Sequence, residues 1–186
     1  TLSHSSAASD VYKRQGTASV IRSIIEKKLD QSTHKLWYMG PMWRYERPQK
    51  GRYRQFYQAG IEILGYKEGS PEFEIISIIC SIIKEFNLQD CYIKINHLGS
   101  QENKEEYCKA LTNYLDPFKD KLDSKDLERL VRNPLRVLDS KNEETKLLLK
   151  DAPSIKNFLE PSALKLLDDI KNQFGDICSI EIDHSL

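Results

Sequence analysis

The sequence has little of what marks several broad classes of protein. It contains only four cysteines in 186 residues, Cys80, Cys91, Cys108 and Cys178, and they form no CxxC pair. This spacing supports neither a zinc ribbon nor a thioredoxin-like redox motif, so we expect buried, reduced thiols and no resident metal or prosthetic group. The longest nearly apolar run, residues 75–83, is less than half of the roughly 20 residues that a membrane-spanning helix requires.

The chain also has no excess of charge of either sign, because 28 Lys and Arg side chains balance 28 Asp and Glu side chains. The balance excludes a protein whose whole surface attracts nucleic acid, but it leaves local basic patches possible. With 39% hydrophobic and 9% aromatic residues, the composition fits one soluble globular domain, or one domain with a small insert. We expect a cytoplasmic protein without a membrane span.

Residues 1–15 differ from the remainder of the sequence. They are rich in Ser and Ala, show no helical or strand period, and lack the charged and apolar regions of a secretory signal. From Gly16 onward, GTASVIRSIIEKKL places apolar residues at helical spacing. We therefore expect a boundary at Gly16, preceded by a leader that is foreign or disordered.

Beyond the boundary, predicted strands and helices alternate, which indicates a chain of mixed helices and strands. Residues 36–46 and 54–64 are rich in aromatic and β-branched side chains and predict a hairpin with a long connection. The other expected elements are a helix begun by Ser70 and Pro71, a strand over 90–97, a turn at Gly99-Ser100 leading into a helix through Leu115, short charged helices after Pro117, a helix over 161–174 and a strand over 177–182.

The hairpin predicts two faces of different character, because side chains alternate along a strand. Pairing Glu46 with Arg54 places Gly40 opposite Gly60 and all even-numbered residues on one side, which we call the even face. The even face collects Arg44, Glu46, Arg54, Gln58 and Glu62, and its two glycines leave room for a ligand. The odd face collects Met39, Trp43, Tyr45, Tyr57, Ala59, Ile61 and Ile63, and we expect it to pack on helices.

Two interpretations of the even face remain open from geometry alone. Arg matches a carboxylate or phosphate, Gln offers a donor and an acceptor, and Glu62 can accept from an ammonium or an imidazole N–H, so a small polar ligand fits. A solvated outer face with cross-strand ion pairs is the alternative. The connection adds Arg47, Lys50 and Arg52, which favour phosphate or nucleic-acid binding, although a merely solvated basic loop has the same composition.

Residues 40–65, GPMWRYERPQKGRYRQFYQAGIEILG, closely resemble motif 2 of histidyl-tRNA synthetases, a strand-loop-strand element of the class II aminoacyl-tRNA synthetase core. GTASVIR from Gly16 resembles the stretch just before motif 2, and NPLRVLDSK from Asn133 resembles a signature in the family's insertion. The likeness covers residues 16–186. It implies an α+β fold in which helices flank an antiparallel sheet, truncated at both ends, with core residues 16–116, a helical insertion over 117–175 and a returning core strand that starts within 176–186.

The resemblance also implies a reaction and its partners. Histidine and ATP, the latter with Mg²⁺, would form histidyl-adenylate and pyrophosphate, and the histidyl group would pass to tRNA(His). The full-length parent would be a homodimer. By resemblance, the catalytic residue is Arg44, which would hold the α-phosphate and the reacting carboxylate. Glu46 would contact adenine, and Arg52 and Arg54 would contact the phosphate tail.

Histidine itself would be bound by one residue of the expected N-terminal helix and three residues of the hairpin. The resemblance implies that Thr17 and Gln58 bind its α-amino group, that Arg44 binds its carboxylate, and that Glu62 reads the imidazole. Residues 47–53 would close over ATP, and Arg47, Lys50 and Arg52 would be candidates for contact with the tRNA acceptor end.

The sequence departs from the family pattern at its ends. Arg14-Gln15 stands where the family has Pro-Glu, and residues 183–186 end where the family continues into its histidine-specific segment. We therefore expect the 186-residue chain alone to be inactive. One alternative is the non-catalytic paralogue that serves as a regulatory subunit of ATP phosphoribosyltransferase, but such paralogues tend to lose the motif 2 residues present here. The other is a synthetase-like module that binds uncharged tRNA within a larger protein.

Overall fold

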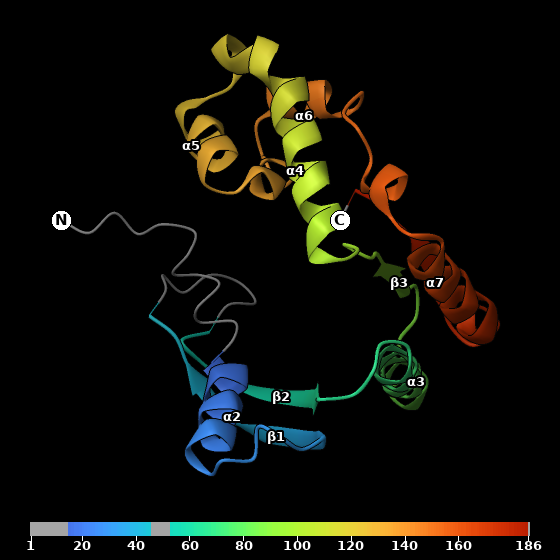
Figure 1. Ribbon diagram of the computed structural model, residues 1–186. Helices are drawn as coiled ribbons and strands as arrows, with labels where there is room; N and C mark the ends of the chain where they lie inside the picture. Colours follow the sequence, from blue (N-terminus) through green and yellow to red (C-terminus); the bar gives the residue numbers. More distant parts are fainter. Residues whose placement is uncertain (1–14, 46–52, 186) are drawn as a thin grey trace. The chain divides into compact units, whose positions relative to one another are not determined.

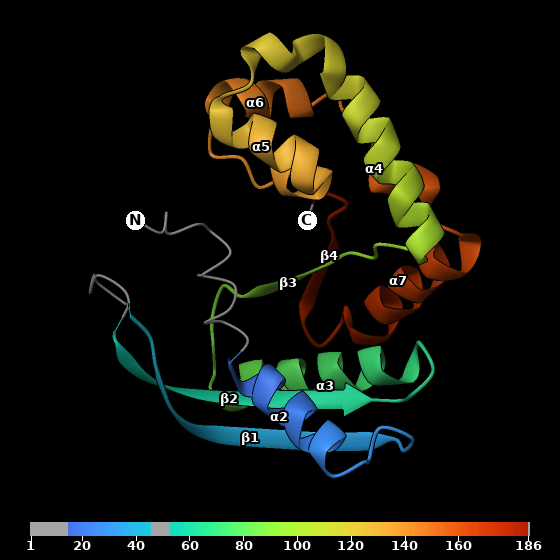
Figure 2. The ribbon, with the colours of Figure 1, turned by 60° about the vertical axis from the view of Figure 1, so that its left-hand side comes forward.

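The computed structural model describes residues 15–45 and 53–185, and the chain divides into two compact units between Glu72 and Phe73. The first unit contains helix α2 (Gln15–Glu26) and strands β1 (His34–Trp43) and β2 (Gln55–Leu64), which form an antiparallel hairpin (Figure 1). Figure 2 shows α2 lying across this hairpin. Ile24 is buried on the helix, as expected for the apolar period of GTASVIRSIIEKKL.

The register of the hairpin differs from the predicted one by two residues. Gly40 pairs with Gln58, and Gly60 pairs with Tyr38. The backbone N–H of Arg44 donates to the carbonyl oxygen of Arg54 at 2.8 Å, so the connection runs from residue 45 to residue 53 rather than from 47 to 53. A shift of two residues keeps every side chain on its predicted face, because the strand period is two.

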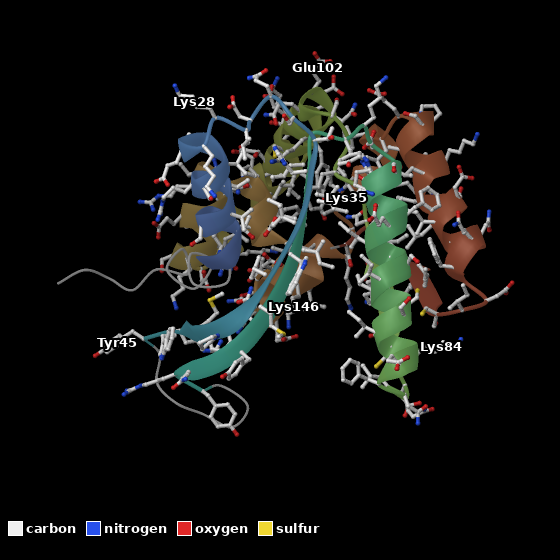
Figure 3. All side chains as sticks on the ribbon, turned by 90° about the horizontal axis from the view of Figure 1, so that it is seen from below. Lys28, Lys35, Tyr45, Lys84, Glu102 and Lys146 are labelled. Carbon is white, nitrogen blue, oxygen red and sulfur yellow. The ribbon has the colours of Figure 1, made fainter. Side chains whose placement is uncertain are left out.

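Within the first unit, the described helix α2 packs on the even face and leaves the odd face exposed, so the predicted packing of the odd face on helices is not found inside this unit. Trp37, Met39 and Tyr57 are 70–77% exposed, and Tyr45 projects at the end of the strands (Figure 3). The even face is the half-buried one along both strands. It is covered in part by α2, which packs on the side of the hairpin that carries the glycine at position 60.

The second unit contains two short strands, with one helix before the first strand and the other helices between the two. Its elements, the first of which begins just before the boundary, are α3 (Ser70–Glu85), β3 (Tyr92–Ile95), α4 (Gln101–Leu115), η1 (Asp116–Lys121), α5 (Ser124–Arg132), η2 (Pro134–Val137), α6 (Glu143–Leu149), η3 (Ile155–Phe158), α7 (Pro161–Phe174) and β4 (Ser179–Ile182). The predicted limits of α7 are confirmed, and α4 ends at Leu115 as predicted. The side chain of Ser100 caps α4 by accepting from the backbone N–H of Asn103.

Strand β4 pairs with β3 in parallel, which the sequence pattern did not predict. Their side chains join a core with α3 and α7 that includes Ile76, Ile170, Phe174 and Ile180. Lys94 Nζ on β3 donates to Oδ2 of Asp183, the residue after β4, at 2.8 Å, and this ammonium is the main group that holds the pKa of the Asp183 carboxyl well below its usual range. Because Ile76 and Cys80 of α3 are buried in this core, the nearly apolar run over residues 75–83 belongs to a core helix.

The cysteines only partly match the expectation of buried thiols. Cys80 and Cys178 are buried in the same core, whereas Cys91 is exposed and Cys108 is half-buried. Burial, helped by the Cys178 thiol, raises the pKa of Cys80 to about 12, so this thiol stays protonated near neutral pH. Within residues 15–45 and 53–185, no three His, Cys, Asp or Glu side chains gather as a metal site, and no helix there is long and apolar enough to span a membrane.

A buried carboxylate organises the segment that resembles the insertion signature. Asp126 on α5 is 1% exposed and accepts from Ser140 Oγ at 2.5 Å, from Thr145 Oγ1 at 2.8 Å and from Arg129 Nη1 at 2.9 Å. Ser140 belongs to NPLRVLDSK and Thr145 to α6, so the network ties three successive elements together. Val137, in the same signature, is fully buried in the adjoining apolar cluster.

Replacing Asp126 by alanine should destabilise the folded chain by about 2–4 kcal/mol, because it leaves buried donors on Ser140 and Thr145 and the Arg129 guanidinium without their acceptor. The free energy of unfolding, measured by urea titration followed by circular dichroism, tests this. Asp120→Ala is the matched control, because Asp120 is exposed. Equal unfolding free energies for both variants would contradict the role of the network.

Candidate active site

The first turn of α2 meets the end of β2 through a direct side-chain contact. Thr17 Oγ1 donates a hydrogen bond to Glu62 Oε1 at 2.5 Å, and both residues are half-buried. The contact brings together two residues that are 45 positions apart in the chain. It fixes the direction of the carboxylate and leaves Oε2 as the oxygen available to a ligand N–H.

Gln58 lies on the even face between Glu62 and the connected end of the hairpin. Its Nε2 donates to the hydroxyl oxygen of Tyr38 at 3.2 Å. A Cβ at Gly60 would collide with the Tyr38 ring, whereas a Cβ at Gly40 would meet no atom within 4 Å. The predicted room for a ligand is therefore present above Gly40 but not above Gly60, because the aromatic ring fills that space.

Arg44 follows β1, and its guanidinium is held from two sides. Its Nε donates to the carbonyl oxygen of Tyr53 at 2.9 Å, and its Cζ lies 4.5 Å from the centroid of the Phe56 ring. Stacking on an aromatic face and a fixed Nε–H restrict the side chain, so that its Nη groups point in a defined direction. Such a restrained guanidinium suits an anionic ligand.

Arg54 lies at the same end of the hairpin, with its Cζ 5.9 Å from the centroid of the Tyr45 ring. The predicted contact residues Glu46, Arg47, Lys50 and Arg52 lie outside the described residues. The structure thus brings together the predicted histidine-binding residues Thr17 and Glu62 directly, and places Gln58 and Arg44 along the same face.

The arrangement offers complementary groups to an amino acid with a basic side chain. From α2 toward the strand ends, the even face presents a carboxylate, an amide and then a guanidinium, contributed by Glu62, Gln58 and Arg44. The Glu62 carboxylate can accept from a ring N–H, the Gln58 amide can accept from an ammonium, and the Arg44 guanidinium can bind an anionic group.

The sequence pattern did not identify Tyr38 as a residue of the site, and it did not predict the contact of the Phe56 ring with the Arg44 guanidinium. Tyr38 has an even number, so the strand period alone placed it on the even face, but its contact with Gln58 depends on the register. Phe56 pairs with Met42 rather than with Arg44, yet its ring still reaches the guanidinium diagonally. An aromatic side chain next to a glycine across a hairpin is the signal that could have identified Tyr38.

Comparison with known proteins is consistent across sequence and structure. A family model described as histidyl-tRNA synthetase matches residues 13–173. The chain is 47% identical over 153 residues to a histidine–tRNA ligase of Francisella philomiragia, covering 81% of this chain and 36% of the relative. It is 42% identical over 165 residues to a histidine–tRNA ligase of Gloeothece citriformis, covering 88% of this chain and 38% of that protein.

A solved structure has a similar fold. The crystal structure of apo histidyl-tRNA synthetase from S. aureus matches with a TM-score of 0.70 at 30% identity, covering 91% of this chain and 40% of that one. The chain spans well under half of the length of these relatives. A family match over most of the chain, together with these relatives, establishes that the chain belongs to the histidyl-tRNA synthetase family.

Proposed function

We propose that the protein containing this chain attaches histidine to tRNA(His) through a histidyl-adenylate. The observation that carries the proposal is the single face of the hairpin on which Glu62, Gln58 and Arg44 stand, with Thr17 bonded to Glu62. The family relationship supports it, because the similar proteins are named histidine–tRNA ligases. ATP, with Mg²⁺ as its counterion, and tRNA would be the other substrates.

In this mechanism the histidine carboxylate attacks the α-phosphorus of ATP, and pyrophosphate leaves with the electrons of the broken P–O bond. Negative charge increases on the α-phosphate oxygens during this step, and the Arg44 guanidinium, restrained by Tyr53 and Phe56, stabilises that charge without reorganising. Gln58 and Thr17 would hold the α-ammonium, and Glu62 would accept from the imidazole. The histidyl group then passes to the end of the tRNA, and AMP leaves.

Specificity follows from the half-buried acceptor on Glu62. An apolar analogue of similar size would leave this half-buried carboxylate without an N–H partner, which costs more than the lost contact itself. The proposed site therefore selects against apolar side chains by leaving the acceptor unpaired.

The decisive experiment is amino-acid-dependent ATP–pyrophosphate exchange by the full reading frame that encodes this chain, tested with each standard amino acid. We expect exchange with histidine alone. A folded protein that binds histidine without exchange would overturn the proposal in favour of the regulatory paralogue. The 186-residue chain by itself should show no exchange, and histidine-dependent adenylate formation by it would refute that expectation.

A further inference from the structure

Tyr38 occupies a position between the helix and both strands. It lies on β1 opposite Gly60, and its ring fills the space above that glycine and above Gly16 in the first turn of α2. Alanine at either glycine would place a Cβ inside the ring. The missing Cβ atoms of the two glycines leave the space that the ring fills. In this position its hydroxyl is directed along the even face toward Gln58, whose Nε2 lies 3.2 Å away.

The Tyr38 hydroxyl can donate as well as accept, and in this structure it accepts from Nε2, so it holds the Gln58 amide with its donor end against the ring hydroxyl. An amide has a donor end and an acceptor end, and the donor end is the one that contacts Tyr38. Oε1 is then the end of the amide that is left to a ligand on the even face, as an acceptor. The opposite orientation would direct two N–H donors at a ligand ammonium, which repels them. An acceptor is what a protonated amine requires.

We propose that Tyr38 is a positioning residue that orients the Gln58 amide so that the site accepts a hydrogen bond from the α-ammonium group of the amino acid. The proposal rests on the proposed function and extends it to a residue outside the predicted set. Because the hydroxyl acts through Gln58, it should affect ligands that carry the amine and leave other ligands unaffected.

The variant Tyr38→Phe in the full reading frame removes the hydroxyl and keeps the ring in the space above Gly16 and Gly60. We expect KM for histidine in the exchange assay to rise about 5- to 10-fold, the effect of one neutral hydrogen bond, with kcat changed less than about twofold. Tyr57→Phe is the matched control, because Tyr57 precedes Gln58 on the same strand but lies on the exposed odd face. The control should behave as the unaltered protein.

Two inhibitors separate positioning from a structural effect. Histamine has the amine and no carboxylate, and imidazolepropionate has the carboxylate and no amine. Tyr38→Phe should weaken competitive inhibition by histamine about 5- to 10-fold and that by imidazolepropionate less than about twofold. Equal weakening of both inhibitors would show a general disturbance of the pocket and overturn the proposal, as would unchanged inhibition by histamine.

A double-variant cycle tests the route through Gln58. In a Gln58→Met background, Tyr38→Phe should have no further effect on KM, because the amide it orients is gone. Additive effects would overturn the proposal. Failure of the proposed function would give a different result. The unaltered full-length protein would then show no histidine-dependent exchange, so no inhibition by either compound could be measured.

Discussion

Replacing Arg44 by lysine is expected to lower kcat for histidine-dependent ATP–pyrophosphate exchange by about 100- to 1000-fold, the range seen when a donor to developing negative charge is removed. Lysine keeps the charge but loses the planar fork, the Nε–H that bonds the Tyr53 carbonyl and the flat surface that stacks on Phe56. The remaining ammonium would be neither oriented nor bidentate. Steady-state exchange kinetics with the full reading frame measure the effect.

The matched control for this variant is Arg132→Lys. Arg132 lies on α5 in an exposed ion pair with Glu128 at 3.0 Å, so the same change there should leave exchange unaffected. If Arg44→Lys kept more than about a tenth of the kcat while folding normally, the electrostatic role assigned to this side chain would be wrong, because the expected loss is at least ten times larger than that.

Replacing Glu62 by glutamine is expected to lower kcat/KM for histidine roughly 10- to 100-fold, which corresponds to one hydrogen bond to a charged group. The amide keeps the shape and an oxygen that can accept from Thr17 Oγ1, so the contact with α2 can persist. The loss would come from the missing charge opposite the imidazole N–H. Exchange kinetics over a range of histidine concentrations provide the measurement.

Glu26→Gln serves as the control for this change, because Glu26 ends α2 in the same unit and is exposed. A second readout is discrimination between amino acids. If Glu62 reads the imidazole, the variant should lose rate with histidine while its low background rate with leucine stays the same or rises. Undiminished kcat/KM with histidine would remove Glu62 from the recognition site.

The sequence predicted the two faces of the hairpin but not its register, and there is a physical reason for this difference. A period of two assigns each side chain to a face regardless of a shift by two residues, so Arg44, Gln58 and Glu62 were grouped correctly. The register depends on where pairing stops before the connection, and no local pattern fixed that point. In the predicted register Tyr38 would lie opposite Glu62, and its contact with Gln58 would not have been expected.

Other parts of the fold depended on signals that the sequence lacks. Local signals predicted both ends of α7, because Pro161 suits the first position of a helix and Gly175 suits its end. The Asp126 network joins residues up to 19 positions apart and carries no periodic signature. The apolar character of the odd face correctly described its composition, but composition does not tell which surface, if any, covers it.

The parallel pairing of β3 with β4 has a consequence for the order of folding. Lys94 and Asp183, which meet at the ends of these strands, are separated by 89 residues, and contacts of such separation raise the contact order of a chain and slow its folding. The intervening helices form their own clusters around Leu111 and Tyr107 from nearer segments. Clusters of this kind can form before the two strands meet and then shorten the effective loop that the strands must close, so we expect the parallel pair to form after the helices.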